Sequence, residues 1–567
     1  MSYFDDASLI MIPSGYKTSK VYSVKPTDGT GDLTFTRSND TATRVASNGL
    51  IERVRTNVLT YSNDFSNAAW SPYEYGGASF VRTYGQNDPF GGITAVKFDI
   101  SVATGGVLFT QNFTTSANAE HGLSVWLKGA VGDEKVQIDL RNTASAGVAG
   151  GLLTLTTEWV RYKITANNDS GTSRGFQFRI TTSQISGSES FYVYGSQAEI
   201  GVPTDYIGPT LAAAVSVGPV ANVPRLDYLG SSCPRLLLEP QRTNLFNFSE
   251  QIDNAGWTKQ NLTITANSAV SPDGYTNADL LDDGTSASTQ HWFFQGTTLA
   301  NSTTYTLSLY AKYVSRQNMI INIFNGASSQ YVNYNIQNGT IVGSTGDVTA
   351  SITSVGNGWY RLTYTRTMAA SGGPNHRIGL ADDTGSETYT GSNKQTLIYG
   401  CQIEAGAYAT SYVNTLNSAV TRGVDAASKS GISSLIGQTE GTLYFEFDYK
   451  YGQINTDLFE ASAGSNDIIR FLALSDFNLR MWMFVGGVQQ AAISTVTIPS
   501  EGRHKVAMAY KENDCAFYLD GVQIGVDTSC TIPAVDALFL KAPNQDTRQV
   551  LVFPTRLSNA DLAALTA

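Results

Sequence analysis

Residues 55–70 read Arg55-Thr-Asn-Val-Leu-Thr-Tyr-Ser-Asn-Asp-Phe-Ser-Asn-Ala-Ala-Trp70, and residues 242–257 read Arg242-Thr-Asn-Leu-Phe-Asn-Phe-Ser-Glu-Gln-Ile-Asp-Asn-Ala-Gly-Trp257. The two stretches align without a gap, and seven of their sixteen positions are identical. Both stretches have an aromatic residue at the same aligned position, Tyr61 in the first and Phe248 in the second. The chain therefore contains one unit twice.

The similarity continues downstream in the same order. Leu123-Ser-Val-Trp-Leu-Lys128 returns as Leu307-Ser-Leu-Tyr-Ala-Lys312, and Tyr194-Gly-Ser-Gln returns as Tyr399-Gly-Cys-Gln. Solenoid repeats have periods of only roughly 20–50 residues. We therefore predict two copies of a whole domain, over residues 54–207 and 241–415.

Apolar residues alternate with polar ones inside these units. In residues 304–312, Tyr305, Leu307 and Leu309 would face one way. This period of two, between turns rich in Gly and Asn, predicts half-buried antiparallel strands. Many such strands in one domain indicate a β-sandwich or jelly roll.

A third unit spans residues 430–567 and is not a copy of the first two. It alternates over residues 443–447, and the turn Asp520-Gly521 predicts a tight hairpin. The predicted fold is therefore all-β, with three tandem antiparallel β-sandwich (jelly-roll) domains. The proline-rich residues 208–240 and the short stretch 416–429 would be linkers.

Residues 1–53 precede the first repeat and contain only short alternating runs. We interpret them as an attachment segment that is too short and irregular to bury a core alone. We expect them to be ordered only against a neighbouring chain or the rest of a larger particle.

The composition excludes several classes of function. The chain of 567 residues has a formal net charge of −11 and no run of Lys or Arg, which argues against a nucleic-acid partner. Its four cysteines form no CxxC pair, so a zinc cluster is not expected. No signal peptide and no apolar run long enough to span a membrane are visible, so we expect synthesis in a cytoplasm.

Several motifs resemble known families. Gly441-Thr-Leu-Tyr-Phe-Glu-Phe447 and Tyr518-Leu-Asp-Gly-Val522 resemble concanavalin A-like lectin and laminin-G domains. The two repeats resemble the carbohydrate-binding-module jelly rolls of bacteriophage fibre and spike proteins, and Leu237-Leu-Glu-Pro-Gln-Arg-Thr-Asn-Leu245 resembles phage structural proteins. The resemblance implies a virion component that displays sugar-binding folds.

A polysaccharide-degrading enzyme is the main alternative. Concanavalin A-like glucanases carry Glu-x-Asp-x-x-Glu on one strand, so that two carboxylates share the catalysis. Glu446-Phe-Asp448 matches the first half of this pattern, but Tyr451 stands where the second Glu is needed. We therefore predict no catalytic residues and no enzymatic activity.

Sugar binding needs aromatic side chains at an accessible rim, because a pyranose face stacks on a ring. We expect the recurring Trp70 and Trp257 to be core residues of the shared fold. Better candidates lie in the variable, turn-rich stretches: Tyr73, Tyr75 and Trp292. Contacts between protomers are the alternative role for these aromatics.

No cofactor is required by any motif. The loop acids Asp282-Asp283-Gly284 and Asp382-Asp383 could supply oxygen ligands to Ca²⁺, although such acids are mostly solvated. No phosphate-binding loop and no paired histidines are present.

These observations favour a non-enzymatic structural protein of a bacteriophage virion, a head or tail fibre or spike, that adheres to host or environmental glycans. A ligand-free capsid decoration protein is a further alternative. We expect a homo-oligomer, and the resemblance to phage fibres implies a trimer. Other virion proteins would bind residues 1–53.

Overall fold

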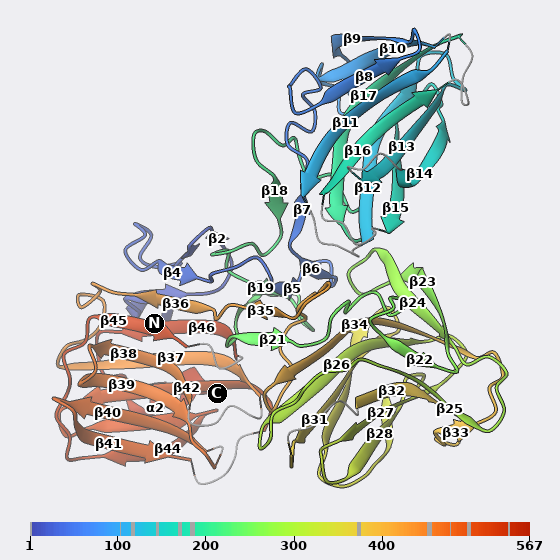
Figure 1. The fold of residues 1–567 in the computed structure, drawn as a ribbon. Coiled ribbons are helices and arrows are strands. Elements are labelled where there is room, and N and C mark those ends of the chain that lie inside the picture. Colours follow the sequence, from blue (N-terminus) through green and yellow to red (C-terminus); the bar gives the residue numbers. More distant parts are fainter. Residues whose placement is uncertain are drawn as a thin grey trace.

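The computed structural model describes residues 3–102, 104–114, 120–142, 147–167, 173–181, 187–370, 376–450, 456–476, 478–495, 500–541 and 545–567. Their regular elements are almost all antiparallel strands, arranged in three lobes (Figure 1). This confirms the prediction of an all-β chain of jelly-roll sandwiches. The helices found in these ranges, α1 (Tyr3–Asp6) and α2 (Asn559–Thr566), are too short to cross a membrane.

The first sandwich has two five-stranded sheets, of order β15-β12-β17-β10-β9 and β14-β13-β16-β11-β8. Phe98 packs edge-on against Phe109 and Phe178 of the opposite sheet, with ring centroids 5.4 and 5.9 Å apart. Buried aromatic rings therefore hold the two layers together. The strands are β8 (Ser71–Tyr75), β9 (Ser79–Gln86), β10 (Ala95–Val102), β11 (Gly106–Thr114), β12 (Glu120–Gly129), β13 (Lys135–Asn142), β14 (Gly147–Thr154), β15 (Val160–Asn167), β16 (Ser173–Thr181) and β17 (Gly187–Ile200).

The second sandwich repeats this strand order. Its sheets run β30-β31-β26-β34-β24-β23 and β22-β25-β32-β27-β28-β29, with β33 paired to β25 beside the second path. They match the sheets of the first sandwich, with β30 added to one sheet and β29 and β33 added to the other. The duplication seen in the sequence is thus a duplication of topology. The strands are β22 (Thr258–Gln260), β23 (Thr263–Val270), β24 (Thr276–Asp282), β25 (Thr289–Phe294), β26 (Thr304–Tyr313), β27 (Asn318–Phe324), β28 (Ser329–Asn335), β29 (Thr340–Ser344), β30 (Thr349–Gly356), β31 (Trp359–Thr367), β32 (His376–Ala381), β33 (Thr388–Tyr389) and β34 (Gln395–Ala405).

The third sandwich has a different strand order. Phe445 and Phe447 of β37 pack beside Phe471 of β39 in its core. One sheet runs β19-β20-β46-β37-β42-β43-β44, where β19 is Leu226–Asp227 and β20 is Arg235–Leu238. The other runs β2-β3-β4-β36-β45-β38-β39-β40-β41, where β2 is Tyr16–Lys17, β3 is Lys20–Val21 and β4 is Leu33–Thr36. Its own strands are β36 (Ala426–Lys429), β37 (Glu440–Tyr449), β38 (Thr456–Ala463), β39 (Asp467–Ala473), β40 (Leu479–Val485), β41 (Val488–Ser494), β42 (Gly502–Lys511), β43 (Cys515–Leu519), β44 (Val522–Asp527), β45 (Ala537–Leu540) and β46 (Gln545–Phe553).

The N-terminal segment completes the third sandwich. β1 (Leu9–Met11) pairs with β46, and β4 (Leu33–Thr36) pairs with β36. Leu33 and Phe35 alternate inward and are buried in the core of that lobe. The expectation that these residues are ordered only against a neighbouring chain or the rest of a larger particle is therefore wrong, because their backbone and apolar groups find partners at the far end of the same chain. The other short strands of this region are β2 (Tyr16–Lys17), β3 (Lys20–Val21), β5 (Thr43–Val45) and β6 (Ile51–Arg53).

The segments that connect the sandwiches are ordered by strand pairing. β7 (Arg55–Asn57) pairs with β18 (Val215–Val217), and β21 (Arg242–Asn244) pairs with β35 (Val420–Arg422), so each duplicated unit closes in the same way. β19 (Leu226–Asp227) and β20 (Arg235–Leu238) extend the sheet of the third sandwich through β46. The proline-rich segment is therefore ordered by the sheet that it extends.

The identical residues of the repeat build the scaffold. Asn57 donates two hydrogen bonds to the carbonyl oxygens of Ser196 and Ile207, at 3.2 and 3.1 Å. Asn244 makes the same pair of contacts with Cys401 and Val413, at 3.1 and 2.9 Å. In both copies the Asn side chain is fully buried and ties the lead-in strand to the last long strand of the sandwich. A buried amide with all these partners is costly to replace, which explains its repetition.

The aligned aromatic residues of the repeat, Tyr61 and Phe248, lie in a turn. Tyr61 and Phe248 both have positive φ, 48° and 52°, which is rare for a large side chain. Their carbonyl oxygens accept the indole N–H of Trp70 and Trp257, each at 3.0 Å. The two tryptophans are buried, as the sequence predicts for core residues. They fix the turn that leads out of the lead-in strand.

A buried ion network joins the segments between the sandwiches. Arg225 of the linker pairs with Glu239, at 2.6 Å, and with Asp425. Arg37 of the N-terminal segment reaches Asp425 at 3.2 Å, and Arg422 reaches Glu239 at 3.0 Å. These five side chains, which we call the arginine hub, are almost completely buried.

The hub predicts sensitivity to acid. Burial opposes the ionisation of Glu239, but Arg422 and Arg225 outweigh burial and hold its pKa well below the ordinary value. Its contribution to stability is then complete above the unfolded pKa of about 4.3 and is lost as the pH falls toward the folded value. We expect Glu239→Gln to lose about 3 kcal/mol at pH 7, because Arg225 and Arg422 stay buried without their carboxylate.

Chemical denaturation at several pH values checks this. The difference between wild type and Glu239→Gln should shrink as the pH falls from 5 to 3, whereas the exposed Glu158→Gln should match the wild type throughout. A difference that stays constant over this range would contradict the assignment.

Candidate functional site

An aromatic pair stands on the edge strand of the first sandwich. Tyr73 and Tyr75 belong to β8, and the period of two along a strand places them on the same face. Their rings are nearly parallel, with centroids 5.7 Å apart and an interplanar angle of 26°. The exposed fractions are 61% for Tyr73 and 39% for Tyr75, which leaves ring surface open to solvent. The structure thus brings two of the predicted ligand residues together, on a strand instead of a turn.

A groove of about 920 Å³ lies beside this pair, on the outer face of the sheet. Strands β11, β16 and β13 supply its polar wall: Thr110, Gln177, Arg179 and Arg141. Gln177 Nε2 donates to Thr110 Oγ1 at 2.8 Å, which fixes the amide across two neighbouring strands. The groove therefore combines flat aromatic surface with guanidinium, amide and hydroxyl groups.

This combination suits a sugar chain. A pyranose presents C–H groups on its faces and hydroxyl groups at its rim, so a ring can cover the face while polar side chains bond the rim. Arginine supplies donors only, and glutamine and threonine supply both donors and acceptors. The volume of the groove lies in the range of small-molecule sites.

The second sandwich does not repeat this groove. Gln260 occupies the position of Tyr73. Tyr73 pairs with Leu108 in the first sandwich, and Gln260 pairs with Trp292, which stands at the place of Leu108 in the second. Trp292 lies against Gly379, where a Cβ atom would stand 2.6 Å from the indole ring. Only 1% of Trp292 is exposed.

The prediction that Trp292 contacts a ligand is therefore wrong. Its ring packs with Ile320 and Ala381 in a small apolar cluster. The Cζ atom of Arg377 lies over the indole, 5.9 Å from the ring centroid. The indole covers the sheet face that is open in the first sandwich. The duplicated scaffold thus carries different surfaces.

Two of the acids considered for calcium, Asp283 and Asp383, have cationic partners. Arg316 bonds Asp283 through two of its nitrogens, with Nε 3.0 Å from Oδ2, and lies 3.3 Å from Asp383. Lys394 Nζ is 2.6 Å from Asp383. The fold does bring the two acidic loops together, but a guanidinium stands between them. The described part of the chain contains no cluster of acids, His and Cys that could hold a metal ion.

The carboxylates of the third sandwich are also paired. Glu446 Oε1 is 2.6 Å from Arg503 Nε, and Asp448 is held by Arg548, at 2.9 Å, and by Arg235. Burial acts against ionisation of Asp448, but the hydrogen bonds from Arg548 and Arg235 outweigh it and keep its pKa below the ordinary value. Asp448 thus anchors the linker through Arg235. Tyr451, at the position of the missing Glu, lies outside the described residues.

Sequence reasoning missed the polar wall of the groove. Gln177 and Arg179 alternate with the core residues Phe176 and Phe178, so the strand pattern does place them on the outer face. That pattern cannot say which outer face is open, because Trp292 occupies the matching face of the second sandwich.

Comparison with known proteins gives likeness of fold only. No known protein family and no curated protein matches the chain. Among solved structures, a tandem CBM22 domain of Xyn10C from Paenibacillus barcinonensis is 14% identical and covers 62% of this chain and 97% of its own, with a TM-score of 0.23. The enzymatically active domain of bacteriophage CBA120 tailspike protein 4 is 15% identical over 26% of this chain and 21% of its own, with a TM-score of 0.21. Domains LG4-5 of the mouse laminin alpha1 chain are 8% identical over 49% of this chain and 90% of theirs, with a TM-score of 0.17.

Proposed function

We propose that this protein is a non-enzymatic structural component of a bacteriophage virion and that it binds glycans through the groove of its first sandwich. The observation that carries the binding function is the exposed pair Tyr73 and Tyr75 beside the polar wall of Arg141, Gln177 and Arg179. Support for the virion setting comes from the sequence motifs that resemble phage structural proteins.

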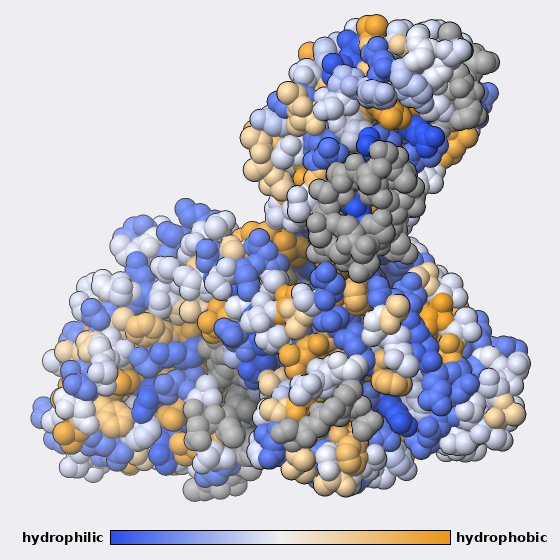
Figure 2. Space-filling model, in the orientation of Figure 1, coloured by the Kyte–Doolittle hydropathy of each residue, from blue (hydrophilic) through white to orange (hydrophobic). Residues whose placement is uncertain are grey.

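The shape of the molecule suits display of one binding module. The first sandwich projects from a base formed by the other two, and both chain ends lie in the lobe of the third sandwich (Figure 1). Hydrophobic and hydrophilic residues are interspersed over the visible face of each lobe (Figure 2). The groove would thus be carried away from the surface to which the base attaches.

The paired carboxylates support a role without catalysis. A glycosidase needs one carboxyl group that can release a proton and a second that is free to attack or to activate water. Glu446 and Asp448 are instead engaged by Arg503, Arg548 and Arg235. Glu446 and Asp448 therefore serve as ion-pair partners of these arginines.

Attachment and assembly are part of the same proposal. Phe4, Tyr22 and Val24 of the N-terminal segment are exposed although they are apolar, which suits contact with another virion protein. A homotrimer would present three grooves together, and linked weak sites raise avidity by about 10²–10⁴.

Binding to immobilised polysaccharides tests the proposed function. Against a panel of bacterial surface polysaccharides, we expect the full-length protein to bind at least one polymer. Replacing both rings, Tyr73→Ala with Tyr75→Ala, removes the stacking surface without touching the core, so affinity for that polymer should fall at least about tenfold, or ~1.4 kcal/mol.

The matched control is Tyr84→Ala, which removes an exposed tyrosine from the other sheet of the same sandwich. It should bind like the wild type. Equal affinity of the double variant and the control, or no binding to any polymer, would refute the groove as a glycan site.

The absence of hydrolysis is tested separately. Prolonged incubation with the same polysaccharides should release no reducing ends, because Glu446 and Asp448 are held in ion pairs. Release by the wild type that disappears in Glu446→Gln would show that the third sandwich is an enzyme.

The oligomeric state is measured by light scattering of the full-length protein. A trimer should give three times the chain mass of 60.9 kDa. A stable monomer at micromolar concentration would overturn the proposed assembly while leaving the groove untouched.

A further inference from the structure

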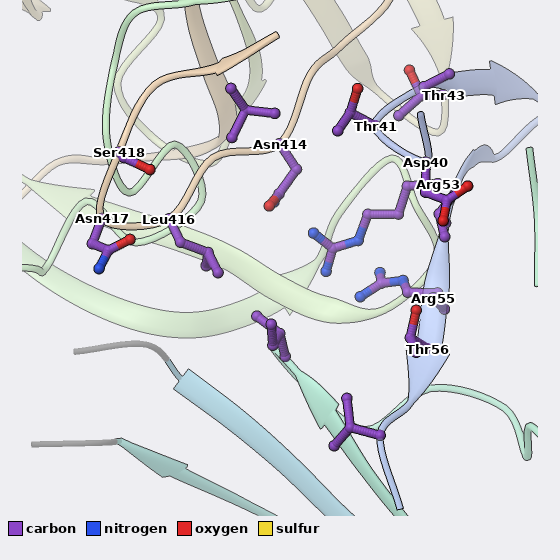
Figure 3. A pocket seen from close by; sticks show the side chains of 15 residues that line it. Asp40, Thr41, Thr43, Arg53, Arg55, Thr56, Asn414, Leu416, Asn417 and Ser418 are labelled. Carbon is purple, nitrogen blue, oxygen red and sulfur yellow. The ribbon is translucent and has the colours of Figure 1, made fainter. Parts of the chain in front are cut away.

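A second cavity, of about 290 Å³, lies at the junction between the first two sandwiches. Its wall combines the lead-in strand of the first sandwich, residues 53–58, with the segment that follows the second sandwich, residues 414–420. Figure 3 shows the side chains of Arg53 and Arg55 extending from the lead-in strand into this cavity, toward Asn414 and Leu416.

The two arginines use only part of their donor capacity. Arg53 Nη1 donates to both oxygens of Glu250, at 2.9 and 2.8 Å, and Arg55 Nη2 donates to Asp273 at 2.7 Å. Arg53 Nε and Nη2 and Arg55 Nη1 are buried without a hydrogen-bond partner among the residues that the structure describes. Arg55 is only 8% exposed. Buried N–H groups without an acceptor are costly, so these groups favour a further acceptor beside them.

Each guanidinium group has one carboxylate partner, Glu250 for Arg53 and Asp273 for Arg55, and keeps N–H groups without an acceptor among the described residues. Asp40, in the cavity wall, accepts a hydrogen bond from the backbone of Ala221. Burial, and after it the positive charge of Arg53, lowers the pKa of Arg55. An anion bound by the unpaired N–H groups of both arginines would offset both effects.

The rest of the lining suits a sugar more than a bare ion. Thr41, Thr56, Asn417 and Ser418 bring hydroxyl and amide groups, and Val58 and Leu416 bring apolar surface. Hydroxyl groups of a pyranose can bond the former, and its C–H face can cover the latter.

We propose that this cavity binds the carboxylate of an acidic sugar, with the unpaired N–H groups of Arg53 and Arg55 as its donors. The choice of a sugar as the carrier of the carboxylate rests on the proposed glycan-binding function. Because residues of both repeats form the wall, a bound acidic sugar would also fasten the first sandwich to the second.

Calorimetric titration of the full-length protein with sodium glucuronate, glucose and inorganic phosphate tests this. Glucuronate should bind once per chain and at least about fivefold more tightly than glucose or phosphate, since it offers both a planar carboxylate and a ring. Arg55→Lys keeps the charge beside Asp273 but loses the fork, and it should weaken glucuronate binding about tenfold.

A second variant is needed in case Arg55→Lys weakens binding by disturbing the fold. Asn417→Asp replaces an exposed cavity residue with an isosteric carboxylate and should also weaken glucuronate, whereas Asn338→Asp, on an exposed turn of the second sandwich, should not. The titration is repeated in Tyr73→Ala with Tyr75→Ala, where binding should persist. Glucuronate binding that persists in this double variant would show that the cavity binds independently of the groove. The proposal for the cavity and the proposal for the groove can therefore be refuted separately.

Three results would overturn the proposal. They are the absence of binding by glucuronate, equal binding of phosphate and glucuronate, and glucuronate binding that Asn417→Asp leaves unchanged.

Discussion

The arrangement of the three sandwiches depends on the arginine hub. Arg37, Arg225 and Arg422 come from three distant segments and share two carboxylates, Glu239 and Asp425, and all five side chains are buried. Buried charges are tolerated only when they are paired with good geometry. The N-terminal segment, the linker and the segment after the second sandwich must therefore meet in one place. The hub thus ties together the segments that connect the three sandwiches.

The duplicated units show how one scaffold can carry different surfaces. Asn57 and Asn244 hold the same backbone groups, and Tyr61 and Phe248 make the same turn. The outer faces of the sheets are under no such constraint. Tyr73 leaves one face open to solvent, and the buried Trp292 closes the other.

The sequence allowed the fold to be predicted more fully than the site. Alternation and the repeat identified the strands and the shared topology, and the aromatics at residues 73 and 75 were found because they stand outside the repeated pattern. The pairing of β1 and β4 with the third sandwich could not be predicted, because it joins residues from opposite ends of the chain. Trp292 was misjudged since burial of an outer-face residue depends on neighbouring strands and loops. Arg316 similarly stands between two acidic loops that look free in the sequence.

If the groove beside Tyr73 and Tyr75 holds a sugar chain, the chain should be visible in a crystal structure. The crystal would be of the full-length protein, soaked with an oligosaccharide from a polymer that it binds. We expect density for a pyranose stacked on at least one of the two rings, with hydroxyl groups within hydrogen-bond distance of Arg179 or Gln177. An ordered oligosaccharide elsewhere on the molecule, with the groove empty, would contradict this expectation.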